Sequence, residues 1–198
     1  MTRRLVQLYI GLVLYGISLA LMVRAQLGLD PWDVLHEGLA NRLPLTFGQV
    51  VIVVGALVLL AWIPLRQRPG LGTISNVFVI GLAVDAALAV LPAPEPIAWR
   101  IVFLVAGVVL NSVATAAYIG ARLGPGPRDG LMTGLVARTG RSVRIVRTSI
   151  ELSVLAGGWL LGGTVGLGTV LYAISIGPLV HFLLPLLTVS KEVELVSD

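Results

Sequence analysis

The chain has 198 residues, of which 57% are hydrophobic and only 12% are charged, with a formal net charge of +4 and no cysteine. A soluble domain has about 45–50% apolar and about 25% charged residues, so this composition excludes an ordinary soluble protein and predicts a lipid-embedded one. The absence of cysteine excludes disulfides, thiolate metal sites and a cysteine nucleophile. The positive charge favours cytoplasmic membrane loops over nucleic-acid binding, because it does not form a basic face on a soluble module.

Six apolar segments follow one another along the chain, and we expect each to cross the membrane as a helix. They cover residues 5–23, 47–65, 74–91, 101–119, 148–161 and 169–188. Most reach the about 17–25 residues that a helix needs to cross about 30 Å of hydrocarbon. The fifth is short unless it begins near Val143, which would place Arg144 and Arg147 at the interface. The first is longer than the apolar part of a signal peptide, so we expect an uncleaved first helix.

Basic residues are concentrated in alternate connections between these segments. If the N-terminus is cytoplasmic, three of the 14 basic residues lie outside, namely Arg24, Arg42 and Arg100. The others lie inside, namely Arg3, Arg4, Arg66, Arg68, Arg122, Arg128, Arg138, Arg141, Arg144, Arg147 and Lys191. Cytoplasmic loops of membrane proteins are enriched in Lys and Arg, so we expect both termini in the cytoplasm.

Two related polar segments each follow a predicted span, LGLDPWDVLHEGL at 27–39 and LGPGPRDGLMTGL at 123–135. Pro31 and Pro127 suit the first turn of a helix, where the missing N–H would be unpaired anyway, and Gly28 and Gly124 mark the turn before it. We expect short helices over 31–42 and 127–138. Each would be about 18 Å long, which is too short to span the membrane. They are therefore predicted to be half-helices, either re-entrant or interfacial.

The two segments belong to a longer internal repeat with an offset of 96 residues and no gap. Arg4 falls on Arg100 and Arg42 falls on Arg138. Further matches include the tetrapeptide GLGT, at 70–73 and again at 166–169. Matched glycine, proline and charged residues in register are informative in a chain this apolar. We therefore divide the single membrane domain, 1–198, into two copies of one unit, 4–91 and 100–187.

Each copy holds three predicted spans, an odd number, so the second copy must be inverted relative to the first. The inside loop RQRPGLGT at 66–73 carries two arginines, whereas its outside counterpart GGTVGLGT at 162–169 carries none, as the inversion requires. The predicted fold is an all-α membrane protein of six transmembrane helices in two inverted three-helix repeats, each with a half-helix after its first span. By fold-level analogy, such repeats are common in transporters and channels, whose site lies near the repeat interface.

Polar residues of the half-helices are candidate substrate- or ion-binding residues. Asp33 and Asp129 lie in the first turns, where a carboxylate can accept the free N–H groups as a helix cap. Alternatively, both acids face a shared pore or pocket, because polar groups at membrane depth tend to be functional. Their duplication does not decide between the two roles, since a structural motif is duplicated as faithfully as a functional one. His36 and Arg128, in the same two segments, join them as candidates.

Asp85 in the third span and His181 in the sixth occupy equivalent positions of the two copies. An acid and an imidazole related in this way could form a proton or cation relay, in which case both would point inward rather than toward lipid. The alternative is that each lies near a helix end and binds interface water. We predict that both approach the repeat axis more closely than Asp33 and Asp129 do.

Arg147 and Glu151 lie one helical turn apart on the same face of the fifth span. A local ion pair between them would lower the cost of inserting both charges into the membrane. Alternatively, basic residues of this region form an inner-face site for an anionic solute or contact anionic lipid headgroups. That set comprises Arg128, Arg138, Arg141, Arg144 and Arg147. Elsewhere, Asn111 could bridge helices by hydrogen bonds.

Known catalytic and cofactor motifs do not account for the polar residues. GPGPRDG at 124–130 lacks the spacing and the preceding strand of a dinucleotide site, and the two histidines are too far apart in sequence for a usual metal motif. There is no GxSxG, HExxH or Walker lysine. We therefore expect no enzyme activity, no cofactor and no metal.

Four segments together, LGLDPWDVLHEGL, IPLRQRPGLGT, LGPGPRDGLMTGL and GGTVGLGTVLYAISIGPLV, resemble the YczE/YyaS/YitT family of bacterial membrane proteins. The resemblance covers about residues 5–187. It implies a polytopic protein of the bacterial plasma (inner) membrane. The family offers no settled site, so the resemblance assigns no catalytic or ligand residue.

Two functional hypotheses follow. The first is a small-solute permease or channel whose gate or pocket is framed by the half-helices. The second is a membrane-embedded substrate-binding, accessory or chaperone-like subunit of a separate enzyme or ATPase. The chain is small for a carrier that works alone, which keeps the second hypothesis open and favours a homodimer. The expected partners are the lipid bilayer and a small solute, and not nucleic acid.

Overall fold

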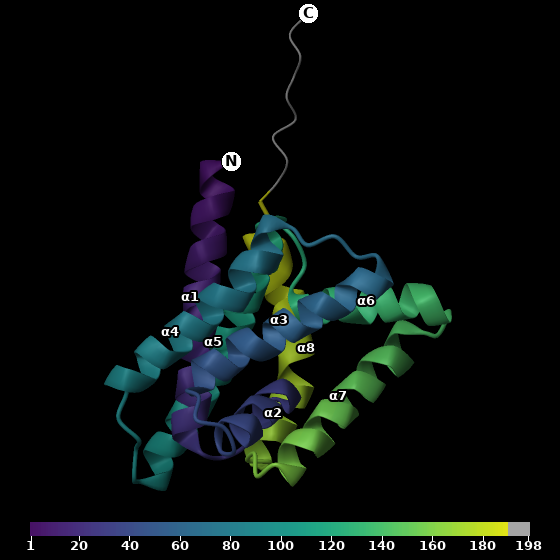
Figure 1. The fold of residues 1–198 in the computed structure, drawn as a ribbon. Coiled ribbons are helices and arrows are strands. Elements are labelled where there is room, and N and C mark those ends of the chain that lie inside the picture. The colour runs from purple at the N-terminus through teal and green to yellow at the C-terminus, as the bar shows by residue number, and fades with distance from the viewer. Residues whose placement is uncertain (190–198) are drawn as a thin grey trace, which may run out of the picture.

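A computed structural model describes residues 1–189, and these form helices and connecting turns without any strand. Lys191, one of the basic residues assigned to the cytoplasmic side, lies outside the described residues. Figure 1 shows the eight helices of the described chain, which are α1 (Thr2–Ala25), α2 (Pro31–Ala40), α3 (Phe47–Leu65), α4 (Leu71–Val90), α5 (Ile97–Gly120), α6 (Pro127–Thr139), α7 (Val143–Leu160) and α8 (Leu167–Leu187).

Five of the helices in the described residues are long and apolar enough to cross a membrane, namely α1, α3, α4, α5 and α8. These correspond to five of the six expected spans. The other expected span is α7, which has 18 residues and begins at Val143, the earlier start considered above. It carries Arg144, Arg147 and Glu151, and these charges keep it out of the apolar group.

The two short helices form where the sequence predicts them. Pro31 is the first residue of α2 and Pro127 is the first residue of α6, so in each the missing N–H falls where no intrahelical partner exists. Gly28 and Gly124, in the preceding turns, have φ values of 110° and 130°, which favour glycine. With 10 and 13 residues, α2 and α6 are too short to cross a bilayer.

The core is built around α1, which packs along α5 and α4. Close approach requires small residues, because a Cβ added at Gly16 would lie only 2.8 Å from the backbone N of Val84 on α4. At Gly11 the added Cβ would lie 3.0 Å from the backbone N of Tyr118 on α5. Small residues at such contacts are typical of helix packing in membranes.

Two arginines that are 96 residues apart make matching hydrogen bonds. The Nε of Arg4 donates to the carbonyl of Ala121 at 2.8 Å, and the Nε of Arg100 donates to the carbonyl of Ala25 at 2.8 Å. Donor and acceptor both shift by 96 residues between the two bonds. Each bond ties the start of one long helix to the end of the other, so α1 and α5 run antiparallel.

The two turns before α2 and α6 each accept a backbone hydrogen bond from a long helix, and these two bonds are also related by 96 residues. The N–H of Gly72 donates to the carbonyl of Leu123 at 2.8 Å, and the N–H of Gly168 donates to the carbonyl of Leu27 at 2.7 Å. Each turn therefore rests against the first turn of the last helix of the other copy. Contacts between the copies hold both half-helices in position.

Residues 4–91 and 100–187 differ in the packing of one helix pair. In the first copy α3 packs along α4, whereas their counterparts α7 and α8 are not among the closely packed pairs of the described chain. In Figure 1, α7 lies at the side of the molecule and diverges from α8 toward α6. This separation leaves room for a cavity between them.

Candidate functional site

A cavity of about 440 Å³ lies between the helices, and its wall includes residues from all eight. The first residues of both half-helices belong to this wall. They are Pro31 and Trp32 of α2, with Asp30 directly before them, and Pro127, Arg128 and Asp129 of α6. Helix N-termini carry free N–H groups and a partial positive charge, so the starts of two half-helices at one cavity form a polar centre in an apolar protein.

Asp30 caps α2. Its Oδ1 accepts hydrogen bonds from the backbone N–H groups of Trp32, at 2.8 Å, and Asp33, at 3.1 Å. The capping role considered for Asp33 is therefore filled by Asp30 on this helix. The reason is positional: Pro31 is the first helical residue, so Asp30 is the N-cap and Asp33 is already inside the first turn.

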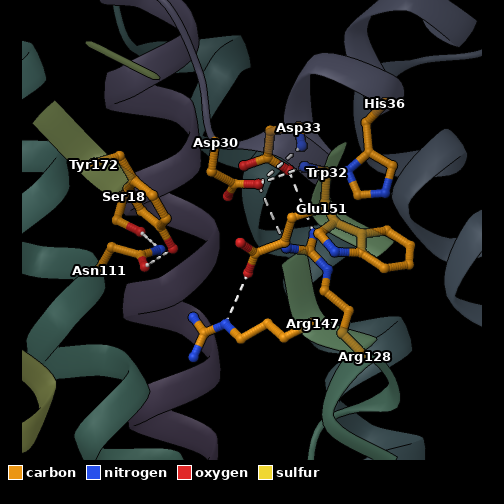
Figure 2. A network of polar contacts seen from close by, with 10 residues as sticks. All are labelled: Ser18, Asp30, Trp32, Asp33, His36, Asn111, Arg128, Arg147, Glu151 and Tyr172. Atoms are coloured by element: carbon orange, nitrogen blue, oxygen red, sulfur yellow. Dashed lines mark hydrogen bonds and ion pairs between the residues drawn. The ribbon is translucent and has the colours of Figure 1, made fainter. Parts of the chain in front are cut away.

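Asp33 is fully buried and accepts contacts from side chains instead. Its Oδ1 lies 2.9 Å from Nδ1 of His36, one turn later. Arg128, on α6, approaches both acids, with Nη1 3.5 Å from Oδ1 of Asp30 and Nη2 3.6 Å from Oδ1 of Asp33. Figure 2 shows the two carboxyl groups side by side, with the contacts of Arg128 running to both. Sequence candidates Asp33, His36 and Arg128 are thus brought together.

Arg128 also lies over the ring of Trp32, with its Cζ 4.9 Å from the ring centroid, a cation–π distance. Trp32 and Arg128 are 96 residues apart, so equivalent positions of the two half-helices are in contact. We define the acid–arginine cluster as Asp30, Asp33 and Arg128.

Burial sets the protonation of this cluster. It raises the pKa of Asp30 to about 7, with a further rise from the charge of Asp33 and an opposing effect from Arg128. Burial also raises the pKa of Asp33. The pKa of His36 falls to about 3 because burial and the charge of Arg128 both disfavour the imidazolium. His36 is therefore neutral near pH 7, and its Nδ1 shares a hydrogen bond with Oδ1 of Asp33.

Asp129, the counterpart of Asp33, has different surroundings. The hydroxyl of Tyr118 on α5 donates to its Oδ2 at 3.3 Å. The N-cap of α6 is Gly126, which has no side chain to cap the helix. Burial raises the pKa of Asp129, as it does for Asp33. The two repeated acids are therefore not equivalent in their contacts.

Arg147 and Glu151 form the expected pair on α7, with Nε 2.9 Å from Oε1, and both belong to the cavity wall. The alternative arginine site at the inner face does not assemble around Arg128, which contacts the acids of α2. Arg138 donates instead to the carbonyl of Pro64, at 2.7 Å. The local ion pair is thus confirmed.

The expected relay between Asp85 and His181 is not formed within residues 1–189. Asp85 accepts hydrogen bonds from the Thr46 hydroxyl and from the N–H of Gly48, at 2.7 Å, and so holds the start of α3. His181 is in the cavity wall and Asp85 is not. The free N–H groups at the start of α3 are the nearer partner for this carboxylate, which explains why it turns away from the cavity.

Several residues of the cavity wall were not predicted. Asp30 could have been found, because the residue before Pro31 is the N-cap, where aspartate is favoured. The sequence does not indicate which aromatic residues line the cavity. Three tyrosines of apolar helices meet there only through helix packing, namely Tyr15, Tyr118 and Tyr172.

Beside the cavity, Asn111 links three helices. Its Nδ2 donates to the hydroxyl of Ser18 on α1 at 2.9 Å, and its Oδ1 accepts from Tyr172 on α8 at 3.0 Å (Figure 2). This is the helix bridge expected of Asn111. Separately, no group of three or more His, Asp or Glu side chains in the described chain could hold a metal ion.

Long apolar helices around a charged central cavity define a polytopic α-helical membrane protein. The chain belongs to a family of unknown function, DUF6198, which matches residues 2–185. It is 42% identical to an uncharacterized protein of Haemophilus influenzae over 177 residues, which cover 89% of this chain and 81% of that protein.

Two relatives come from Bacillus subtilis. The uncharacterized membrane protein YczE is 37% identical over 180 residues, 89% of this chain and 83% of its own length. The uncharacterized protein YyaS is 25% identical over 181 residues, 89% of this chain and 90% of its own length. These matches confirm the resemblance to YczE and YyaS. No solved structure matches the chain.

Proposed function

We propose that the protein is a small-solute permease of the bacterial plasma membrane and that the central cavity is its substrate site. The observation that carries the proposal is that the N-terminal ends of both half-helices line one cavity of about 440 Å³, with buried charged groups in its wall. In many transporters, such half-helix ends bind the solute near the middle of the membrane. The proposed activity involves no catalytic step and no cofactor.

The proposal includes two inverted repeats, 4–91 and 100–187, with α7 as the sixth span. The bonds that recur with an offset of 96 residues, from Arg4 and Arg100 and between the half-helix turns, support the repeat. At about 1.5 Å per residue, the 18 residues of α7 are about 27 Å long, close to the hydrocarbon thickness. Arg144, in its first turn, would then lie at the interface, while Arg147 pairs with Glu151 further along the helix.

The proposal also places both termini in the cytoplasm. In support, Gln7 near the start of α1 donates to the carbonyl of Leu187 at the end of α8, at 2.6 Å, so the two ends of the described chain lie on one side (Figure 1). Basic residues are concentrated in the segments assigned to that side. Reporter fusions after Arg68 should give a cytoplasmic signal, and fusions at Glu95 and Thr164 an external one. A cytoplasmic signal at Glu95 would exclude the inversion.

A second candidate function is an accessory or substrate-binding subunit for another membrane protein. The separation of α7 from α8 favours it, because an unpacked helix pair leaves a side of the molecule open to a partner. A second copy of this chain would be the simplest such partner.

Transport by the purified protein alone tests the first candidate against the second. The protein is reconstituted in liposomes and assayed for uptake of a panel of labelled metabolites. We expect uptake of at least one solute, loss of that uptake in Asp30→Asn, and normal uptake in Glu95→Gln, which makes the same chemical change in an exposed loop. Absence of uptake from the whole panel, with restored activity when a partner protein is added, would favour the accessory role.

A further inference from the structure

The acid–arginine cluster lacks one positive charge. Two buried carboxylates, Asp30 and Asp33, face a single guanidinium, that of Arg128. Its contacts at 3.5 and 3.6 Å are longer than the about 2.7–2.9 Å of a direct charge-assisted hydrogen bond. If both acids are ionised, the cluster has a net charge of −1 away from water, which is unfavourable.

Two carboxylate oxygens in the cluster also lack donors. Oδ2 of Asp30 and Oδ2 of Asp33 are buried and have no hydrogen-bond partner among residues 1–189. Asp30 is only 1% exposed and still belongs to the cavity wall. Buried polar atoms are normally satisfied, so unpartnered oxygens beside a cavity indicate a missing donor. The missing group must carry a positive charge and must donate hydrogen bonds to these oxygens.

The other charged and titratable groups near the cluster do not supply it. His36 is neutral and already bonds Asp33, Glu37 on the same helix is an acid, and Tyr15 and Tyr172 contribute phenols from α1 and α8. The further titratable groups of the wall are His181 of α8, Tyr118 and Asp129, which bond each other, and Arg147 and Glu151, which form an ion pair. The described parts of α3 and α4 contribute no charged residue to the wall.

This distribution favours a cation over an anion as the ligand. Both arginines of the wall already contact carboxylates, Arg128 with Asp30 and Arg147 with Glu151. A bound anion would have to replace one of these carboxylates as the partner of an arginine. Aromatic side chains complete the surroundings, with Trp32, Tyr15 and Tyr172 in the same wall. Aromatic faces and carboxylates together are the groups that recognise organic ammonium ions.

We propose that the acid–arginine cluster binds one positive charge at a time, either the ammonium group of a small organic amine or a proton, so that the permease exchanges amines for protons. The proposal rests on the permease function above and names its substrate class and coupling ion. One ammonium ion enters for each proton that leaves, so the cluster is neutral in both occupied states. The empty state alone has a buried charge of −1, and its cost couples the release of one ligand to the binding of the other.

The raised pKa of Asp30, about 7, supports this role, because a carboxyl group that titrates near neutral pH can hold a proton and release it under cellular conditions. Of the two acids in the cluster, Asp30 is the one that belongs to the cavity wall, and Asp33 shares the guanidinium of Arg128.

Calorimetry of the full-length protein in detergent tests the proposal with phenethylammonium as the probe, chosen for its ring and its primary ammonium. Titrations in buffers of different ionisation enthalpy give the number of protons released per bound probe. We expect close to one proton released at about pH 6 and almost none at about pH 8.5, because the site is then already deprotonated.

Three variants and one matched ligand decide the outcome. Asp30→Asn and Asp33→Asn should each lower the affinity at least tenfold and abolish proton release, whereas Glu95→Gln should bind as the wild type does. Phenylpropanoate, a carboxylate with a similar ring, should not bind. The proposal is overturned if the probe does not bind, if it binds without releasing protons, or if phenylpropanoate binds instead. If the amine–proton proposal is overturned but the liposomes take up another metabolite, the permease function is still supported.

Discussion

The starts of the two half-helices share one backbone design and differ in their chemistry. Both begin with a glycine at positive φ and a proline at the first helical position. The equivalent positions then diverge, because α2 has Asp30 and Trp32 where α6 has Gly126 and Arg128. Acids are gathered on one half-helix and their arginine partner comes from the other. Two helix starts with similar backbones thus bring complementary groups face to face, and neither half-helix could form this cluster alone.

The largest effect is expected from removing the arginine. Arg128→Ala should lower the free energy of unfolding by about 3–5 kcal/mol, because it leaves two buried carboxylates without a counter-charge. Unfolding in mixed micelles near neutral pH measures the change, and acid should restore part of the stability by protonating the acids. Arg138→Ala, which removes an exposed arginine of the same helix, is the control. Equal losses in the two variants would show that Arg128 does not compensate the acids.

The second largest loss of stability is expected where the packing of the two half-helices differs. Gly130 of α6 lies against Trp62, and a Cβ there would be 1.9 Å from Cζ2 of that ring. Gly130→Ala should therefore cost about 1–3 kcal/mol. The counterpart on α2 is Val34, which packs against Gly158 instead. In a double-mutant cycle, Trp62→Leu should recover part of the loss, and strict additivity would contradict this contact.

Removing the N-cap of α2 is expected to lower the free energy of unfolding by less than the two changes above. Asp30→Ala should cost about 0.5–2 kcal/mol, because it removes the acceptor for two backbone N–H groups, whereas Asp30→Asn should retain most of the stability. Thermal unfolding at about pH 5, where the acid is mainly protonated, separates the cap from the charge. Equal stability of the Ala and Asn variants would show that the cap is unimportant.

The raised pKa of Asp30 predicts the direction of a pH-dependent effect on stability. Its pKa is about 7 in the folded protein and about 3.9 in an unfolded chain, so the folded state binds more protons between these values. Stability from this group is complete below about pH 4 and is lost as the pH rises through about 7. The melting temperature should fall over this range, and the fall should be weaker in Asp30→Asn. A steeper fall in the variant would contradict the assignment.

Features that are local in sequence could be predicted, and features made by packing could not. The starts of α2 and α6 were placed correctly, because Gly28, Pro31 and their counterparts act on their own backbone. The pair Arg147–Glu151 was also predicted, since one helical turn separates its members. The capping role considered for Asp33 belongs instead to Asp30, three residues earlier.

The cluster itself depends on contacts between distant segments. Asp33 and Arg128 are far apart in sequence, and only the packing of α2 and α6 around one cavity brings them together. The same limit explains the failed prediction for Asp85. Its sequence position suggested a partner in His181, but it meets Gly48 at the start of α3. Pseudo-equivalence of position did not imply equivalent surroundings.

The permease account depends on a cavity that solutes reach from both sides of the membrane. Because the chain has no cysteine, a single cysteine can report this directly. We predict that Met132→Cys, in the cavity wall of α6, reacts with a membrane-impermeant thiol reagent in both right-side-out and inverted vesicles. Phe78→Cys, at an exposed position of α4 outside the wall, should react in neither. If Met132→Cys fails to react in one or both vesicle types, the result contradicts alternating access to the cavity.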